Sequence, residues 1–428
     1  MASDRLDVVI FGATGFTGQC AVERGVEFLA KVKWGIAGRS QVKLEKIRTD
    51  IGLKVSKDLS HIPIIIADVA DEGSLTKMAQ QAKVVINCCG PYRHFGEPVV
   101  KACIASKTHH IDVSGEPQYM EKMQLKYHKE ACEAGVYVVS ACGFDSIPAD
   151  LGTVFHERQF NGVVNSVETY LVAKGDGPGA SVHYGTWESA VYGLAHANEL
   201  RELRSQLYKE RLPPMKPTLK NRPILHRAPI VRNAVCLPFL GSDRSVVMRS
   251  QRFLFETQNK RPVQIRTYMS VGNYITAFLF IMAGAIFSIF TRFSFGRHLL
   301  LEYPKIFSFG FASHEGPSEE KRKNSKFTMW FQGKGWSDVL SEGEDQYKDP
   351  PTKTLVTKVA GVDFGYGNTA AALLLCATTI LNENKNMPGE GGVLAPGAAF
   401  GKTSLIDELN KNKVFTFEVV ADKNISQN

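Results

Sequence analysis

Val8-Val9-Ile10-Phe11-Gly12-Ala13-Thr14-Gly15-Phe16-Thr17-Gly18, near the start of the 428-residue chain, is the stretch that decides the fold. A short apolar run predicts a strand, Gly-x-x-Gly-x-x-Gly follows it, and the residues after Gly18 are typical of a helix. Glycines let the backbone turn tightly and approach a pyrophosphate, and the start of the helix presents free N–H groups to it. This context predicts a dinucleotide-binding βαβ unit, whose phosphates are held by Gly12, Thr14, Gly15, Phe16, Thr17 and Gly18.

The end of the second expected strand, residues 32–38, indicates which dinucleotide binds. A site that selects NAD usually has an acidic residue there, on the ribose 2′-hydroxyl. Here Arg39 and Ser40 follow the strand, with Lys43 shortly after them. A guanidinium can hold a 2′-phosphate through two hydrogen bonds, so we expect NADP(H) as the cofactor, bound by Arg39 and Ser40. The alternative is that Arg39 is only a solvated residue at a strand end.

Strand and helix patterns alternate along the next hundred residues. We expect strands at 62–68, 84–89, 110–114 and 136–141, and helices at 71–81, 97–105 and 121–134. This order predicts an α/β fold with a doubly wound parallel sheet, whose ligands lie at the carboxyl ends of the strands. We therefore also expect Asp68, Cys89 and Gly90 to contact the cofactor, although a simple turn explains Asp68 equally well.

Polar residues gather after the fourth, fifth and sixth expected strands, in segments 90–97, 112–117 and 142–150. These segments should border the crevice in which the nicotinamide would lie. The candidate catalytic residues, each a possible proton donor, are Tyr92, His94, Asp112 and Asp145, and spacing alone does not choose among them. The eight cysteines form no Cys-x-x-Cys and no metal-ligand spacing, so we expect reduced thiols and no metal site.

Six segments together resemble the saccharopine dehydrogenase-like oxidoreductases, namely residues 12–18, 37–40, 87–92, 112–116, 143–150 and 391–400. The resemblance implies a Rossmann domain, a second α+β sheet domain that covers the cofactor, and a C-terminal return to the Rossmann domain. It also implies similarity to bacterial trans-acting enoyl reductases of glycolipid synthesis, and it points to lipid droplets. Ser146-Ile147-Pro148 departs from the Gly-Leu-Asp-Pro-Gly of true saccharopine reductases, so saccharopine is not carried over as the substrate.

The length of the chain allows at least two hydrophobic cores. We expect an NADP-binding Rossmann domain at 1–150, a substrate domain at 151–365, and a C-terminal segment at 366–428 that packs back on the first domain. In the second domain the resemblance places on the substrate side His183, Tyr184, Thr186 and Trp187, with ordinary packing as the alternative for the tyrosine and the tryptophan. The charged residues before the first strand argue against a signal peptide, so we do not expect secretion.

Residues 271–311 form an apolar segment, which we expect to associate with a membrane. No residue from Thr267 to Thr291 is charged, and nine of the 25 phenylalanines lie between Phe278 and Phe311. The stretch is only just long enough to span a membrane, and the alternative is a helix buried in the core. The preceding basic arm, 209–266, has 13 Lys and Arg against three acidic residues, which favours an anionic lipid surface over a merely solvated loop.

The residues after 311 show soluble strand and helix patterns, so a single membrane crossing would prevent the fold from closing. A re-entrant hairpin or interfacial helix fits better, on a lipid droplet or the cytosolic face of a membrane, with mitochondria as a further location. We expect an NADP(H)-dependent oxidoreductase of a hydrophobic or lipid-linked substrate, with no nucleic-acid partner because no binding module accompanies the charge. The alternatives are a non-catalytic NADP-binding droplet scaffold and a reductase of an amino-diacid such as saccharopine. The oligomeric state cannot be inferred.

Overall fold

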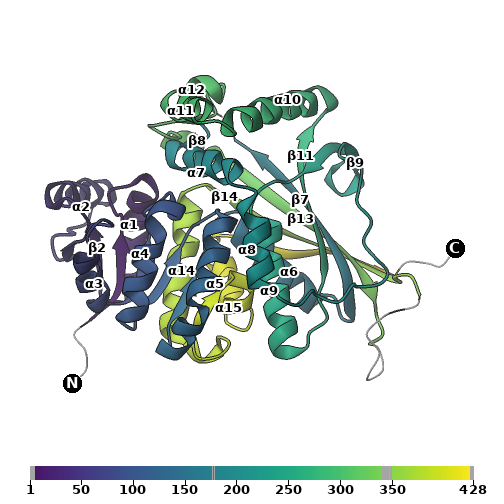
Figure 1. The fold of residues 1–428 in the computed structure, drawn as a ribbon, viewed down its shortest axis with the longest axis horizontal. Coiled ribbons are helices and arrows are strands. Elements are labelled where there is room, and N and C mark those ends of the chain that lie inside the picture. Colours follow the sequence, from purple (N-terminus) through teal and green to yellow (C-terminus); the bar gives the residue numbers. More distant parts are fainter. Residues whose placement is uncertain (1–4, 176, 178, 340–346, 348, 425–428) are drawn as a thin grey trace.

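The computed structural model describes residues 5–424 except 176, 178, 340–346 and 348. The first of its two seven-stranded sheets is wholly parallel, and this confirms the expected doubly wound α/β fold (Figure 1). Its strands, in spatial order, are β15 (Gly392–Leu394), β6 (Tyr137–Val139), β5 (His109–Asp112), β4 (Ala82–Asn87), β1 (Leu6–Phe11), β2 (Trp34–Gly38) and β3 (Ile64–Ile66). The direction of winding reverses between β1 and β4, which is where a dinucleotide binds in such sheets.

The central strands form because their side chains are apolar on both faces. Val8, Val9 and Ile10 of β1 are fully buried, as expected for a parallel strand covered by helices on both sides. The helices that connect these strands are α1 (Phe16–Phe28), α2 (Gln41–Val55), α3 (Glu72–Gln80), α4 (Tyr92–Ala105) and α5 (Pro117–Ala134).

Helix α4 begins five residues before the expected start at 97, because a distant carboxylate caps it. The backbone N–H groups of Tyr92 and Arg93 donate to Glu116 Oε1 and Oε2 at 2.9 and 3.0 Å. Glu116 lies on the loop after β5, so no local pattern in residues 90–97 could have indicated this start. Helix α5 likewise begins at Pro117 rather than 121, since proline fits the first position of a helix.

The second sheet is mixed, with one parallel pair, β11 with β7. Its strands, in spatial order, are β16 (Thr416–Asn424), β14 (Lys353–Val362), β13 (Lys326–Trp336), β7 (Val163–Lys174), β11 (Gln264–Gly272), β10 (Ala234–Pro238) and β9 (His226–Ala228). Helix α6 (Ser146–Gln159) contacts β7, β13 and β14, and α9 (Asp243–Gln258) contacts β11. The two helices also contact each other, and their N-termini lie near the carboxyl ends of the parallel sheet.

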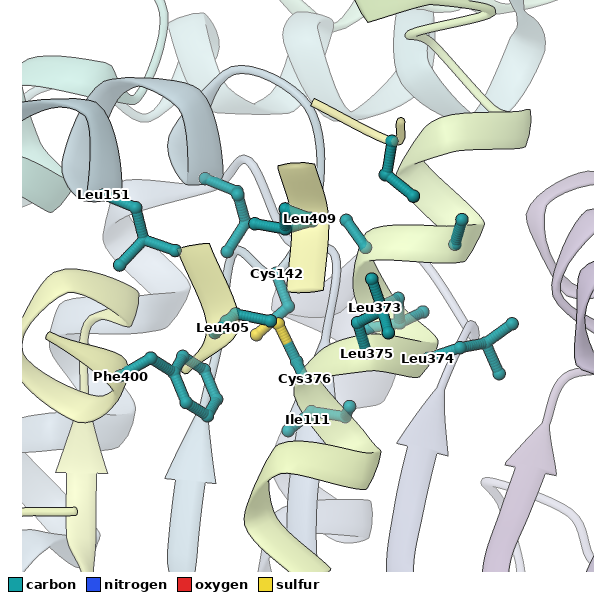
Figure 2. Packing of buried hydrophobic residues seen from close by; sticks show 14 of the residues in the cluster. Ile111, Cys142, Leu151, Leu373, Leu374, Leu375, Cys376, Phe400, Leu405 and Leu409 are labelled. Carbon is teal, nitrogen blue, oxygen red and sulfur yellow. The ribbon is translucent and has the colours of Figure 1, made fainter. Parts of the chain in front are cut away.

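The last part of the chain contributes to both sheets, through β15 in the first and β16 in the second. Between them, α14 (Gly367–Glu383) contacts α1, β4 and β5 and is buried along most of its length. Figure 2 shows its leucines and Cys376 packed with Ile111 and Cys142 at the centre of the core. The short elements nearby are η2 (Asn384–Asn386), α15 (Pro396–Phe400) and α16 (Leu405–Lys411).

An excursion of about fifty residues separates β11 from β13. It contains α10 (Tyr274–Thr291), α11 (Ser294–Glu302), α12 (Pro304–Phe307), β12 (Ala312–Ser313) and α13 (Glu319–Asn324). Strand β12 pairs with β8 (Val182–His183), which leads into α7 (Tyr184–Ala195), and α7 contacts both α10 and α11 (Figure 1). The remaining elements are α8 (Glu199–Leu207) and η1 (Pro229–Val231).

Candidate functional site

Two positions in the turn after β1 are restricted to glycine, because a side chain there would clash with neighbouring atoms. Gly12 has a φ of +79°, and a Cβ there would lie 2.7 Å from Cys89 Sγ at the end of β4. A Cβ on Gly18 would overlap the carbonyl oxygen of Gly12, so a side chain would push α1 away from the turn. These contacts fix the turn at the point where the sheet reverses direction.

Gly15 differs, because a Cβ there would meet only the Gly12 carbonyl oxygen, at 3.3 Å. The space in front of this residue is therefore free of protein. Helix α1 starts directly after it, with no side-chain cap and no acidic residue in its first turn. Its first N–H groups have no partner within the helix, so Thr14, Gly15, Phe16 and Thr17 frame a cradle that fits a pyrophosphate.

Phe16 is held by its ring rather than left to face the cradle. The ring stacks on His183 with centroids 4.8 Å apart, and the edge of Tyr366 meets it at 4.7 Å. Arg322 lies on the same ring, 5.9 Å from its centroid. The backbone N–H of Phe16 is thus the part available to a phosphate, and the ring joins the turn to the second half of the chain.

The ends of β2, β3 and β4 bring Arg39, Asp68 and Cys89 close to one another. Burial raises the pKa of the Cys89 thiol to about 12, with Arg39 opposing this shift and Asp68 adding to it. Arg39 is exposed, and no described residue pairs with it. This position suits a 2′-phosphate, and the contact of Arg39 with that group stays a prediction.

Ser40 and Asp68 both take part in local turns. Ser40 Oγ accepts the Lys43 N–H at 3.4 Å and so caps α2. Asp68 Oδ1 accepts the Ala70 N–H at 3.0 Å, which is the turn that the sequence left open as an alternative. Their contact with the cofactor, like that of exposed Gly90, stays a prediction.

Of the four expected proton donors, Tyr92 and His94 are placed unfavourably. Tyr92 is buried, and its hydroxyl donates to the Asn87 carbonyl oxygen at 2.9 Å. His94 is exposed, and its ring makes a T-shaped contact with that of Tyr192, with 4.9 Å between the ring centroids. Partial burial and the charge of Arg93 lower the pKa of its imidazole. The hydroxyl of Tyr92 is therefore committed to the backbone, and His94 lies exposed at the start of α4, beside α7.

Asp112 is fully buried and fully hydrogen-bonded. Its Oδ1 accepts the N–H groups of Ser114 and Ala141 at 2.9 and 3.3 Å. Its Oδ2 accepts the hydroxyls of Tyr119 and Ser140 at 3.1 and 2.9 Å. Burial raises the pKa of Asp112 to about 6, against the lowering effect of these bonds. The carboxylate thus ties together the ends of β5 and β6.

Asp145 is the expected donor whose carboxyl group is uncommitted. It precedes α6 with φ +79° and ψ −75°, a conformation that costs energy for a residue other than glycine and that clusters at active sites. The residue is half-buried, and its side chain accepts no hydrogen bond from any residue that the structure describes. Burial raises the pKa of Asp145 to about 7, so it can carry a proton near neutral pH.

Two crevice carboxyls were not singled out from the sequence. Glu116 caps α4 and also accepts the Ser189 hydroxyl of α7 at 2.9 Å. Asp243, the first residue of α9, is 1% exposed and lies on the turn that meets Asp145. The polar segment 112–117 did contain Glu116, whereas no sequence pattern connects Asp243 with residue 145, almost a hundred positions away.

The expected substrate-side residues of α7 face two directions. His183 contacts the phosphate turn, and Thr186 Oγ1 lies 3.4 Å from the Tyr366 hydroxyl. Tyr184 stacks on His314 at 4.3 Å. Trp187 faces the other way, since its Nε1 donates to the Leu300 carbonyl oxygen at 2.8 Å and its ring lies 4.9 Å from Phe287.

Comparison with known proteins places the chain in a family. Residues 8–139 match the family profile described as the saccharopine dehydrogenase NADP binding domain. A human saccharopine dehydrogenase-like oxidoreductase is 42% identical over 427 residues, which cover 98% of each chain. The chain belongs to the saccharopine dehydrogenase-like oxidoreductases. Its cofactor is therefore NADP(H), and the expected recognition, cofactor and enzyme class are confirmed.

Two further similarities extend this family assignment. A Caenorhabditis elegans relative described as a lipid droplet localized protein is 38% identical over 410 residues, covering 95% of this chain and 96% of the relative. The solved apo saccharopine dehydrogenase (L-Glu forming) of Saccharomyces cerevisiae has a TM-score of 0.55 at 14% identity, covering 98% of this chain and all of that one. At that identity the solved structure supports the fold only.

This member of the family exposes the apolar helix α10 to the surroundings. The helix is long and apolar enough to cross a membrane, and only 11% of it is buried. Ile275 and Phe278 are 76% and 61% exposed, and Phe309 beyond α12 is 87% exposed. The alternative of a buried core helix is therefore wrong. The expected segment 271–311 also needs a small correction, since Val271 and Gly272 end strand β11.

The basic arm 209–266 is folded rather than free. It forms β9, β10, α9 and β11 along the second sheet. Arg222 pairs with Glu168 at 2.7 Å, Arg252 with Glu256 at 2.9 Å, and Lys260 with Glu157 at 2.8 Å. Part of the positive charge is thus neutralised within the fold, and exposed residues such as Arg227, 5.3 Å from the Tyr274 ring, are the ones that can meet a lipid surface.

Proposed function

We propose that this NADP(H)-dependent oxidoreductase acts on a hydrophobic or lipid-linked substrate at the surface of a lipid droplet or membrane. The observation that carries the proposal is the exposed apolar face of α10. An apolar patch of this kind marks an interaction site, and an uncharged aliphatic and aromatic face suits acyl chains. The name of the C. elegans relative supports a droplet as the lipid surface.

Helix α7 connects this apolar face with the cofactor crevice. On one side Trp187 contacts Phe287 of α10 and the backbone of α11. On the other side Ser189 donates to Glu116, and Tyr192 meets His94. One helix therefore separates the lipid-facing helices from the ends of β4 and β5, so a substrate leaving the lipid has a short distance to travel.

The order of strands in the second sheet supports attachment from one side. Strand β11 precedes α10 and β13 follows the excursion, and both pair with β7. A single crossing would place neighbouring strands of one sheet on opposite sides of the membrane. The helices α10–α12 would therefore lie within one leaflet or a droplet monolayer, on whichever organelle presents that surface, mitochondria included.

The residues of the crevice have distinct roles in this reaction. Bound NADP(H) would donate or accept a hydride. Asp145 would hold or take the accompanying proton, because its carboxyl group is free and has a pKa near 7. Asp112 and Glu116 fix the loops that border the crevice, through the hydrogen bonds given above.

Oxidation of NADPH in the presence of cellular lipid or water-soluble extracts tests the proposal. We expect the lipid extract to stimulate oxidation, and we expect Asp145→Asn to lower the rate by about 100-fold or more, in the range of a lost general acid, while NADPH still binds. Asp407→Asn, at an exposed aspartate of α16, is the control that should retain the rate. No oxidation with either extract would favour the scaffold alternative, and stimulation by the water-soluble extract alone would contradict the lipid substrate.

A further inference from the structure

Two helix N-termini bring Asp145 and Asp243 together beside the crevice. Asp145 immediately precedes α6, and Asp243 is the first residue of α9. A Cβ on Gly241 would lie 3.0 Å from Asp145 Oδ2, so the turn before α9 lies against this carboxyl group. The hydroxyls of Ser146 and Ser242 lie 3.2 Å apart and join the two turns.

One carboxyl oxygen of Asp243 is left without a partner in the part of the chain that the structure describes. Asp243 is 1% exposed, and its Oδ1 is buried without a hydrogen bond to any described residue. None of the ion pairs among the described residues involves Asp145 or Asp243. A buried carboxylate beside a half-buried one, without a cation, is unfavourable, and retention of a proton removes one of the charges.

Other charged groups also lie around the pair formed by Asp145 and Asp243. Asp150 on α6 also faces Asp243, but its carboxyl group accepts the Gly397 N–H and the Ser250 hydroxyl at 2.7 Å each. Arg249 on α9 further offsets the charge of Asp150, and Glu157 on α6 adds to it. Burial raises the pKa of Asp243 well above its ordinary value, and Asp145 raises it further.

The same helices favour one negative charge on the pair. Each N-terminus presents partly positive N–H groups, which stabilise a nearby anion. Asp145, the N-cap of α6, makes no capping hydrogen bond through its side chain, and neither does Ser242, the N-cap that precedes Asp243 in α9. A pair with one proton and one negative charge avoids a second poorly solvated charge and keeps one anion that the two helix ends can stabilise.

We propose that Asp243 is a positioning residue that shares a single proton with Asp145 and so keeps Asp145 ready to donate near neutral pH. This rests on the proposed function of Asp145 as the proton donor. Reduction of the substrate consumes NADPH and one proton and yields NADP⁺ and the reduced product. The O–H bond of Asp145 breaks, its electron pair stays on the carboxylate, and the proton forms the new bond on the substrate. Solvent then returns one proton to the pair.

Thermal unfolding of the full chain at pH 5 and pH 8 tests the shared proton without substrate or lipid. A carboxyl whose pKa is raised in the native state binds more protons than in the unfolded state. For such a group the free energy of unfolding therefore falls as the pH rises from the ordinary pKa of 3.8 to the native pKa of about 7. We expect Asp243→Asn and Asp145→Asn each to reduce the wild-type fall in Tm between the two pH values by roughly half or more.

The double variant and one control decide the interpretation. A shared proton predicts that Asp145→Asn/Asp243→Asn reduces the fall no further than either single variant, and that Asp407→Asn, at an exposed aspartate of α16, keeps it. Additive effects, or a Tm lowered equally at both pH values, would overturn the proposal and leave Asp243 with a structural role. If NADPH oxidation is absent but the pH effect is as expected, the proposed function fails and the proton-sharing pair stands.

Carbon-13 NMR of aspartate carboxyls in the wild-type chain gives a second measurement, should Asp243→Asn fail to fold. We expect two carboxyl signals that shift together over coupled steps, one of them near the value of about 7 for Asp145. Complete ionisation of both groups at pH 5 would overturn the proposal.

Discussion

The phosphate turn and the apolar helix α10 both leave groups without partners, but they differ in how closely they specify what binds. At the turn, a Cβ on Gly12 or Gly18 would clash with neighbouring atoms, and the free N–H groups of α1 point to a single kind of ligand. Along α10 only apolar character is specified, since most of its large side chains are exposed. Backbone geometry therefore identifies a ligand, whereas an exposed apolar face identifies only a class of surroundings.

The largest effect is expected at Gly15, because the only protein atom near its Cβ position is a carbonyl oxygen at 3.3 Å. Gly15→Val should fill the space in front of the turn and weaken NADPH binding by roughly 100-fold or more, about 3 kcal/mol, while the fold is kept. Isothermal titration calorimetry measures the binding, and circular dichroism checks the fold. NADPH affinity equal to that of the wild type would place the phosphates elsewhere.

The matching change on the apolar helix should release the protein from lipid. Phe280→Asp together with Ile286→Asp places two charges on the exposed face of α10. We expect the variant to move from the floating droplet fraction to the soluble fraction and to retain NADPH binding, because neither side chain contributes to the core.

Leu53→Asp is the matched control for this change, since Leu53 of α2 is also apolar and 76% exposed but lies far from α10 in the fold (Figure 1). It should leave the distribution unchanged. Loss of both lipid attachment and NADPH binding in the double variant would mean that α10 supports the fold, and the contrast between the two regions would disappear.

A smaller effect is expected at Arg39, because this residue selects between two cofactors, whereas Gly15 is needed for either of them to bind. Arg39→Asp should reduce NADPH affinity by about 10- to 100-fold, the equivalent of roughly 1.4 to 2.7 kcal/mol, and should abolish or reverse the preference over NADH. Titration with both cofactors gives the ratio. Equal wild-type affinities for NADPH and NADH would show that Arg39 makes no contact with a 2′-phosphate.

The smallest effect is expected from the basic residues beside α10. Arg227→Ala should weaken binding to vesicles that contain anionic phospholipid by about 1 kcal/mol, roughly fivefold, at low salt. The difference should shrink at high salt, while attachment through α10 persists. Sedimentation with vesicles measures both, and Lys57→Ala on the Rossmann side is the control. Complete release of the wild type by salt would make charge, rather than apolar burial, the main attachment.

The sequence was sufficient wherever the deciding contacts are local. The strand and turn at 8–18, the alternation up to residue 141 and the apolar stretch 275–290 depend on neighbouring residues. The early start of α4 depends on Glu116, twenty-four positions from Tyr92, and the position of Asp243 against the Asp145 turn depends on how α9 packs on α6. The order of strands in the second sheet also depends on long-range contacts, because β7 pairs with β11 and β13 across long insertions.

Transfer of deuterium from NADPH labelled at C4 of the nicotinamide distinguishes reduction of a lipid from reduction of a water-soluble compound. The protein is bound to droplets that contain cellular lipids, supplied with labelled NADPH and a water-soluble extract, and the lipid and aqueous fractions are analysed by mass spectrometry. We expect one deuterium per molecule in a lipid, with none when Gly15→Val replaces the wild type. Label confined to water-soluble compounds, or absent from both fractions while NADPH is bound, would contradict the proposed reduction of a lipid.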